Sequence, residues 1–425
     1  MRSFLRRTVG PLFLMLATPI ALGVFWLTAS EYDGSLMRFF TEMSASRLVE
    51  VWPRPSLAAI EIIGIFAIVE ALLMQLLPGK TLLGPVTPTG NQPTYKLNGP
   101  LAFVTTLGLF VGASWGLHLF SPGVVYDHFG EILTTVTLFA LCFCLFLYLK
   151  GVYFPSSSDH GRSGNFIFDF FWGVELHPHF GKFNVKQYAN CRLGMMGWPV
   201  IIVSFLGKQQ ALYGEVSNSM WVCTAVQLVY IAKFFYWEGG YFHTLDIMHD
   251  RFGYYICWGV LCWITGVYTL TSLYLVNHPI HLHPVYAVAC FALGVISIWI
   301  NYDADAQRQR LRRTGGNTTI WGKKPETILA KYKTSDGVER ENLLLVSGWW
   351  GVARHFHYVP EIMLSVAWAL PALFHNFLPW FYVVYLSILL FDRSGRDDKR
   401  CSAKYGESWK EYCKRVPYRI IPGIY

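Results

Sequence analysis

Two arginines in the C-terminal half have the spacing of a phosphate site. Arg308 and Arg312 lie four residues apart in the basic run 308–313, and residues at this spacing share one face of a helix. The planar guanidinium group binds phosphate oxygens through two parallel hydrogen bonds. The pair therefore suits a phosphate such as the 2′-phosphate that distinguishes NADPH from NADH. Alternatively, the run is only the basic flank that often follows a membrane span.

A polar and aromatic stretch, 343–358, follows these arginines. Trp350 or Tyr358 could stack on a nicotinamide or adenine ring, while Arg354 and His357 could bind phosphate or amide groups. The alternative is a belt of Trp and Tyr at the membrane surface. Such a belt does not account for an arginine and two histidines so close together, so the stretch is a candidate for holding a planar cofactor.

Charged residues of both signs reappear in the segment 392–419. Charges this close to apolar sequence indicate a satisfied polar pocket, in which Asp397 could accept hydrogen bonds from a ribose hydroxyl. The chain has neither a G-x-G-x-x-G nor a G-x-x-x-x-G-K-[ST] motif, so a nucleotide would not lie in a Rossmann or P-loop cradle. Side chains would have to bind its phosphates.

A fourth group of ionisable residues lies between residues 238 and 251. Asp246, His249 and Asp250 have the spacing i, i+3, i+4, so they share one face if this segment is helical. Together with Glu238 they are either a cytoplasmic cap at a membrane boundary or an acid network that delivers a proton to a buried pocket. Their spacing leaves both interpretations open.

The elements that position these groups are predicted to be membrane-spanning helices. Of the 425 residues, 53% are hydrophobic and only 15% are charged, well below the roughly 25% charged residues of soluble domains. The apolar residues form eight long runs, each near the roughly 20 residues that cross a bilayer core. These runs are 11–29, 57–77, 101–120, 131–150, 197–213, 219–237, 254–276 and 285–301.

Two apolar segments depart from this pattern. The fifth run is interrupted by the polar residues 207–210, so it is either a span or a broken helix that lines a cavity. A further apolar segment, 361–391, contains Pro371 and Pro379, and each half is too short to span alone. We therefore expect a helical hairpin there. The predicted fold is all-α, a polytopic membrane protein with about ten transmembrane helices including this C-terminal hairpin.

Basic residues set the predicted orientation. The first apolar run follows three arginines, Arg2, Arg6 and Arg7. Because no small-residue cleavage site follows and further spans do, we predict a retained helix rather than a signal peptide, with a cytoplasmic N-terminus. This orientation places the basic segments 150–195 and 302–356 in the cytoplasm. The predicted outer loop 30–56, which contains three arginines, does not fit the rule.

The composition also bears on metal and nucleic-acid binding. The nine cysteines include no pair at C-x-x-C spacing, so we interpret them as core residues and predict no metal site. The net charge of +8 lies mainly in predicted cytoplasmic segments, where it would attract anionic lipid or a phosphorylated cofactor. Because the basic residues lie in short loops between spans, we predict no nucleic-acid binding.

The motifs, taken in order, resemble those of the sterol reductase family, which includes Δ14, Δ24(28) and Δ7 reductases and the membrane domain of the lamin B receptor. The resemblance covers most of the chain. The shared segments are Trp52-Pro53-Arg54-Pro55, Thr87-Pro88-Thr89-Gly90, Gly164-Asn165-Phe166, Asp246-Ile247-Met248-His249-Asp250, Trp321-Gly322-Lys323-Lys324-Pro325, Leu345-Val346-Ser347-Gly348-Trp349-Trp350-Gly351 and 416–423. Residues 354–361 and the ending 422–425 look like the Δ7 branch, particularly its plant-type members. The Δ14 branch more often has Asn in place of His357.

The resemblance implies ten transmembrane helices, a sterol substrate and an NADPH site. The implied NADPH contacts are Arg308, Arg312, Leu345, Trp350, His357, Tyr358, Asp397, Cys401, Lys404, Tyr405 and Tyr412. We divide the chain into a transmembrane bundle with the sterol pocket, 1–301, and an NADPH-binding region with the hairpin, 302–425. The implied membrane is the endoplasmic reticulum in a eukaryote or the inner membrane in a bacterium, with the NADPH site in the cytoplasm. Membrane lipid is the other expected partner, and the sequence specifies no protein partner.

The Δ7 branch implies reduction of the C7=C8 bond of a 5,7-diene sterol such as 7-dehydrocholesterol. An isolated alkene resists hydride because nothing nearby accepts the negative charge, so a proton must reach C8 before hydride from NADPH adds to the allylic cation at C7. The candidates for proton delivery are Glu238, Tyr241, Asp246 and His249, with Tyr241 as the terminal donor.

Other functions share parts of the pattern. One alternative is a reductase of another sterol double bond, Δ14 or Δ24(28). Another is a membrane methyltransferase of the isoprenylcysteine type, which also has an Arg-His motif, an apolar hairpin and a late acidic pair but uses S-adenosylmethionine. A third is a non-catalytic sterol-binding protein. The methyltransferase has no need of Arg308 and Arg312, which a 2′-phosphate requires.

Overall fold

The computed structural model describes residues 4–87, 89–333, 337 and 339–425. Arg2 and Pro88, which entered the sequence analysis, lie outside these residues. The chain divides into two compact units: unit 1 comprises Met1–Leu282 and Ala372–Pro379, and unit 2 comprises His283–Pro371 and Trp380–Tyr425. The eighth long helix groups with the C-terminal residues, whereas the sequence-based division at residue 301 followed the end of an apolar run.

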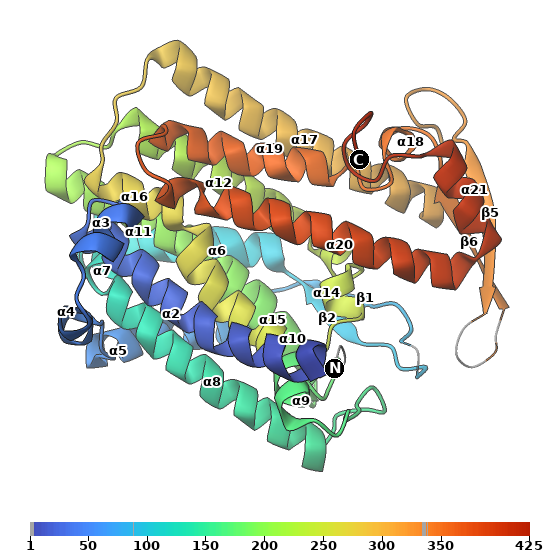
Figure 1. Ribbon diagram of the computed structural model, residues 1–425, viewed down its shortest axis with the longest axis horizontal. Coiled ribbons are helices and arrows are strands. Elements are labelled where there is room, and N and C mark those ends of the chain that lie inside the picture. Colours follow the sequence, from blue (N-terminus) through green and yellow to red (C-terminus); the bar gives the residue numbers. More distant parts are fainter. Residues whose placement is uncertain (1–3, 88, 334–336, 338) are drawn as a thin grey trace. The chain divides into compact units, whose positions relative to one another are not determined.

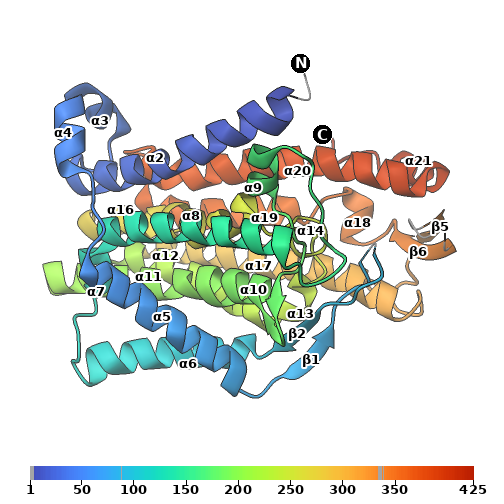
Figure 2. The same ribbon diagram turned by 90° about the horizontal axis from the view of Figure 1, so that it is seen from below.

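Unit 1 consists mainly of helices. In chain order these are η1 (Leu5–Val9), α2 (Gly10–Glu31), α3 (Leu36–Glu42), α4 (Ala45–Val51), α5 (Leu57–Leu76), α6 (Gly99–Val111), η2 (Gly112–Gly116), α7 (Val124–Asp127), α8 (Phe129–Tyr153), α9 (Phe166–Trp172), α10 (Val185–Gln187), η3 (Tyr188–Gly194), α11 (Met195–Tyr213), α12 (Asn218–Tyr236), α13 (Glu238–Tyr241), α14 (Leu245–Met248), α15 (Tyr254–Trp258), η4 (Gly259–Tyr268) and α16 (Leu270–Asn277). Figure 2 shows α5 beside α6, which it also contacts.

All eight predicted apolar runs are helical over most of their length. Within the described residues, eight helices are long and apolar enough to cross a membrane. They are Leu5–Glu31, Leu57–Leu76, Gly99–Gly116, Phe129–Tyr153, Val185–Tyr213, Asn218–Tyr236, Tyr254–Asn277 and Pro284–Arg313. Helices dominate because a backbone in lipid must satisfy its own hydrogen bonds. The prediction of a mostly helical, polytopic membrane protein is therefore confirmed.

The fifth span is continuous through its polar interruption. The ammonium group of Lys208 donates to Asp127 at 2.6 Å, and Nε2 of Gln209 donates to the carbonyl of Leu275 at 2.5 Å. In an apolar 18-residue stretch of Val185–Tyr213, 83% is buried inside the protein. Protein neighbours rather than lipid therefore surround these polar groups, and the alternative of a broken helix is not observed here.

Three short antiparallel hairpins accompany the helices. They pair β1 (Lys80–Leu83) with β2 (Thr94–Leu97), β3 (His179–Phe180) with β4 (Phe183–Asn184), and β5 (Thr327–Lys333) with β6 (Glu339–Leu345). The strict all-α prediction missed them. In β5, Ile328 and Ala330 are buried and alternate with exposed residues, which is the period of a strand with one covered face.

Unit 2 is built around three helices that lie alongside one another (Figure 1): α17 (Pro284–Arg313), α19 (Tyr358–Ala369) and α20 (Phe381–Tyr405). The hairpin β5–β6, the short α18 (Trp349–Val352) and α21 (Glu407–Arg415) complete it. Two single turns, η5 (Leu370–Ala372) and η6 (Leu378–Trp380), lie between α19 and α20.

The predicted C-terminal hairpin 361–391 is present as α19 and α20. Helix α19 ends at Ala369, and the chain continues as a single 3-10 turn that contains Pro371, whose nitrogen has no hydrogen to donate to the preceding helical turn. Helix α20 continues well beyond residue 391 and carries the charged residues 392–404 on the same helix. The acidic residues expected after the hairpin therefore have a rigid helical support.

Candidate functional site

The last turns of α17 place Arg308 against an aromatic ring. Its guanidinium carbon lies 4.2 Å from the centroid of the Trp350 ring, a cation–π distance, and Nη2 donates to Asp305 Oδ1 at 3.3 Å. Arg308 keeps 37% of its side chain exposed. Arg312 is also exposed, and the two positive charges repel each other. An anion bound between them would relieve this repulsion.

A glycine turn docks two tryptophans on α17. Gly348 has a φ of 63°, and a Cβ at this position would lie 2.2 Å from Oε1 of Gln307, so glycine is required. That Oε1 accepts a hydrogen bond from the main-chain N–H of Trp349 at 3.1 Å. The indole N–H of Trp350 donates to the carbonyl of Ala304 at 2.7 Å. The turn thus fixes the ring against which Arg308 stacks.

The histidines after this turn belong to the same aromatic group. The His357 ring lies 5.0 Å from the Trp350 ring and 4.3 Å from the Tyr358 ring, between centroids. His355 stacks on Tyr358 at 5.3 Å with an interplanar angle of 8°. The structure therefore brings together Trp350, His357 and Tyr358, as the sequence analysis expected of residues that hold one ligand.

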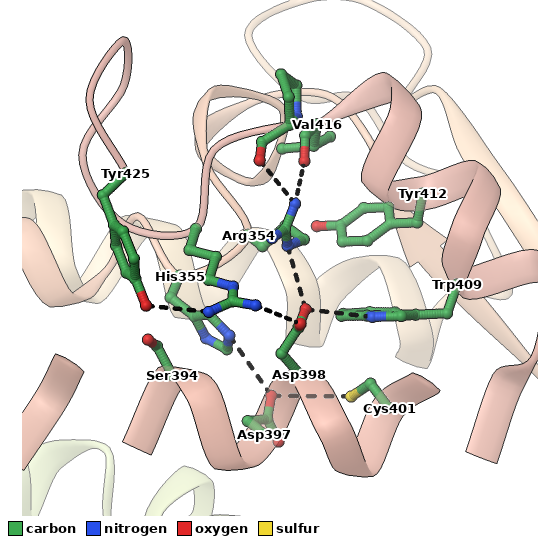
Figure 3. A network of polar contacts seen from close by, with 12 residues as sticks. Arg354, His355, Ser394, Asp397, Asp398, Cys401, Trp409, Tyr412, Val416 and Tyr425 are labelled. Atoms are coloured by element: carbon green, nitrogen blue, oxygen red, sulfur yellow. Dashed lines mark hydrogen bonds and ion pairs between the residues drawn. The ribbon is translucent and has the colours of Figure 1, made fainter. Parts of the chain in front are cut away.

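Asp398 of α20 is enclosed by structural partners (Figure 3). Its carboxylate lies 3.5 Å from Nε of Arg354, and it accepts hydrogen bonds from Arg419 at 3.0 Å and from the indole of Trp409 at 3.3 Å. Arg354 also donates to the carbonyls of Val416 and Pro417 at 2.7 and 2.9 Å. Only 7% of the Arg354 side chain is exposed. Arg354 therefore holds the C-terminal segment, and we no longer expect it to bind phosphate.

Asp397, the next residue, has different neighbours (Figure 3). It accepts a hydrogen bond from Nη2 of Arg400 at 2.6 Å, and its Oδ2 lies 3.8 Å from Nε2 of His355. Burial raises the pKa of this carboxyl. The positive charges of Arg400 and of the more distant Arg308 lower the pKa by a larger amount, so the net shift is downward. Asp397 is ionised at neutral pH and is suited to accept a hydrogen bond from a hydroxyl group.

Burial lowers the pKa of the His355 imidazole to about 4. The positive charges of Arg308 and Arg354 also lower this pKa, whereas the negative charge of Asp397 raises it. The ring is therefore neutral at neutral pH. Its Nε2 is buried and makes no hydrogen bond to the described residues.

The remaining predicted cofactor residues build the surroundings of this centre. Cys401, Tyr405 and Tyr412 are buried in a hydrophobic cluster with residues of β5 and β6, and Leu345 packs against Trp350. Burial raises the pKa of the Cys401 thiol to about 12, so the thiol is neutral. Lys404 is exposed, with its ammonium group 4.0 Å from the centroid of the Tyr332 ring.

These residues have the chemistry that a phosphorylated dinucleotide needs. Two repelling guanidinium groups, an ionised carboxylate and an indole surface lie on elements that pack together within unit 2. The donor set fits phosphate and hydroxyl groups. Among the described residues, no group of three or more His, Cys, Asp or Glu side chains could hold a metal ion.

The four predicted proton-transfer residues lie in unit 1. Glu238 is buried and paired with Arg192, whose Nη1 donates to it at 2.6 Å. The ring of Tyr241 packs at 4.9 Å from that of Phe234. Asp246 is half-buried, whereas His249 is exposed.

Asp246, His249 and Asp250 would share one face only if a helix ran through all three, and this condition is not met. Helix α14 ends at Met248, and His249 has a φ of −129° that leaves the helical conformation. The main-chain carbonyls of Ile247 and Asp250 instead accept hydrogen bonds from the buried ammonium group of Lys186, at 2.8 and 2.6 Å. That lysine therefore holds the main chain of the turn that follows α14.

Several buried polar residues of unit 1 were missed by the sequence analysis. They are Glu70, His177, Lys186 and Arg192. Burial lowers the pKa of His177 to about 3, and its Nδ1 lies 3.5 Å from the hydroxyl of Tyr95. For Glu70 a signal existed, since an ionisable residue within an apolar run is a functional candidate by itself.

Known proteins match almost the whole chain. The profile of the ergosterol biosynthesis ERG4/ERG24 family matches residues 12–425. The chain is 50% identical over 418 residues to the 7-dehydrocholesterol reductase of Arabidopsis thaliana, covering 97% of this chain and 96% of the relative. It is 36% identical over 432 residues to the protein of that name from Xenopus laevis, covering 97% and 91%. It is also 36% identical over 421 residues to the Delta(14)-sterol reductase of Methylotuvimicrobium alcaliphilum, covering 97% and 94%.

The buried neutral His355 predicts a pH-dependent stability. Because its folded-state pKa of about 4 lies below its ordinary value of 6.5, the unfolded chain takes up a proton first as the pH falls. Stability is therefore full above pH 6.5 and declines toward pH 4, by about 3 kcal/mol in total. Thermal unfolding in detergent across this range should show a smaller decline for His355→Gln. The exposed His243→Gln serves as the control, and an equal decline in all three proteins would contradict this account.

Proposed function

Because the chain belongs to the ergosterol biosynthesis ERG4/ERG24 family, we propose that it reduces the C7=C8 double bond of a 5,7-diene sterol with NADPH. The observation that carries the Δ7 position is the similarity, over almost the whole chain, to proteins named 7-dehydrocholesterol reductase. The eight long apolar helices fit a substrate that resides in lipid. The proposed location is the endoplasmic reticulum, or the inner membrane of a bacterium, with the cofactor site in the cytoplasm.

The proposed cofactor site is the one centred on Arg308 in unit 2. NADPH, when bound, supplies the hydride. Arg308 and Arg312 bind its 2′-phosphate, and Asp397 accepts a hydrogen bond from a ribose hydroxyl. Trp350 provides an apolar surface, and the buried residues Leu345, Cys401, Tyr405 and Tyr412 keep that surface in place.

The proposed proton route is the group of Glu238, Tyr241, Asp246 and His249 in unit 1. His249 is exposed and can take a proton from water, while Asp246 is half-buried. The phenol of Tyr241 acts as the terminal donor to C8 of the sterol. The carboxylate of Glu238 accepts a proton and passes it on to the phenolate that Tyr241 leaves after donation.

The competing activity is reduction of the Δ14 bond, which the similarity to a bacterial protein named Delta(14)-sterol reductase favours. The purified protein should be incubated with NADPH and sterols that carry Δ7, Δ14 or Δ24(28) bonds. We expect mass spectrometry to show reduction of the 5,7-diene and no comparable turnover of the other two. Turnover of the Δ14 sterol alone would replace the proposal, and sterol binding without NADPH oxidation would indicate a non-catalytic protein.

The arginine pair predicts a preference for the phosphorylated cofactor. Arg308→Ala and Arg312→Ala should each raise KM for NADPH by about tenfold or more, since each removes charge-assisted hydrogen bonds to phosphate. KM for NADH should not change. Arg310→Ala, an exposed arginine between them, is the matched control. Unchanged KM for NADPH in both variants would remove the pair from the site, and binding of S-adenosylmethionine instead would favour the methyltransferase.

The proposed proton route predicts a separation of binding from turnover. Asp246→Asn and Glu238→Gln should lower kcat by about a hundredfold or more, the usual contribution of a positioned acid or base. NADPH binding, measured by fluorescence titration, should remain intact. The exposed Glu215→Gln is the control. Turnover at the normal rate in both variants would show that neither carboxyl takes part.

A further inference from the structure

Helix α5 carries a carboxyl group that the proposed reaction has not used. Glu70 lies in the last third of this long apolar helix, and none of its surface is exposed. Its Oε1 accepts a hydrogen bond from the hydroxyl of Thr106 on the neighbouring α6. Its Oε2 is buried and has no hydrogen-bond partner among the described residues. An ionised carboxylate in this setting would be left with half of its acceptor capacity unsatisfied.

The nearest positive charge, Arg192, is already committed to another carboxylate. Its Nη1 donates to Oε1 of Glu238 at 2.6 Å, and the two side chains are 0% and 2% exposed. Oε2 of Glu238 accepts a hydrogen bond from the main-chain N–H of Gly99 at 3.1 Å. A Cβ on Gly99 would lie 2.6 Å from that oxygen, so the close approach requires glycine. Both oxygens of Glu238 are therefore stabilised as a carboxylate.

A hydrogen-bonded link joins this ion pair to the helix that carries Glu70. Nη2 of Arg192 donates to Oδ1 of Asn98 at 2.8 Å. Nδ2 of the same asparagine donates to the carbonyl of Met74 at 3.1 Å, one helical turn beyond Glu70. The charge of Arg192 also acts on Glu70 directly. The two carboxyl groups thus face one cation.

The balance of charges around Arg192 requires that one of the two carboxyl groups keeps its proton. The other ionisable groups nearby are the phenol of Tyr188, which donates to the carbonyl of Ala67 at 2.5 Å, and the thiol of Cys191. Both groups are ordinarily neutral at pH 7. With one arginine and two carboxyls, full ionisation would leave an unbalanced negative charge in the interior, which is strongly unfavourable. Glu70, with the poorer set of donors, is the carboxyl that keeps its proton.

We propose that Glu70 stores a proton and supplies it to Glu238 during sterol reduction. Once Tyr241 has given its proton to the sterol, the O–H bond of Glu70 breaks and an O–H bond forms on Glu238, with a water molecule as the carrier. While Glu238 holds this proton, the negative charge lies on Glu70 and is balanced by Arg192. Glu238 then passes the proton to the phenolate of Tyr241, and solvent water returns a proton to Glu70. The inference rests on the proposed function, because it assigns the stored proton to that reaction.

An infrared measurement tests the protonation state without relying on turnover. The spectrum of the wild-type protein minus that of Glu70→Gln should contain the carbonyl stretch of a protonated carboxylic acid, above the amide I band. Glutamine mimics the protonated side chain, since its oxygen still accepts from Thr106 and its amide takes the place of the O–H. Glu61→Gln, at an exposed position of the same helix, is the matched control and should leave the carboxylic acid band in place.

Kinetics of the same variants test the role of the stored proton. Glu70→Gln should lower kcat at least tenfold and leave KM for NADPH and for the sterol unchanged, because the variant cannot release a proton. Loss of the infrared band together with this change in kcat supports the proposal. A difference spectrum without a carboxylic acid band, or a normal kcat in Glu70→Gln, overturns it. Failure of the wild-type protein to reduce any sterol would count against the proposed function, while the infrared band would still decide whether Glu70 holds the proton.

Discussion

Burying an ionised side chain away from water costs several kcal/mol unless an opposite charge and further hydrogen bonds accompany it, and most of the polar interior of this protein follows from that cost. Lys150 pairs with Glu175 at 2.7 Å and Arg192 with Glu238 at 2.6 Å, and all four side chains are less than a tenth exposed. Such pairs let polar side chains pack among apolar helices. A charge without a full set of partners therefore stands out as a candidate for chemistry.

The same constraint separates two roles among neighbouring residues of unit 2. Arg354 and Asp398 neutralise each other in the interior and hold the C-terminal segment through its carbonyls. Among the described residues Arg308 makes a single ion pair, and it keeps more than a third of its side chain exposed. The first pair stabilises the fold, whereas the second arginine retains the capacity to bind an anion. Adjacent positions along α20 divide in the same way, with Asp398 enclosed and Asp397 turned toward His355 (Figure 3).

In unit 1 the cost of burying a charge decides which carboxyl group keeps its proton. A reaction that begins by protonating an alkene needs an acid in an environment from which bulk water is largely excluded. One cation shared by two carboxyl groups creates such an acid, because the low-dielectric interior cannot hold both negative charges. The position of Asn98 between Arg192 and the end of α5 keeps this arrangement rigid. Structural hydrogen bonds and the proposed proton store therefore belong to one network.

The amino-acid sequence by itself determined the class of this protein. Apolar runs of sufficient length must become helices in lipid, because every backbone polar group there needs a partner within the chain, and this outcome depends only on local composition. The residue types of the candidate site were also visible, since Arg308 and Arg312 form a local pattern. Only the tertiary structure decided which charges neutralise each other. Glu238 meets Arg192 across 46 residues of sequence, and Arg354, in the turn before α19, meets Asp398 of α20. No spacing along the chain encodes such contacts. The structural role of Arg354 and the proposed protonated state of Glu70 could therefore be inferred only from the packed helices.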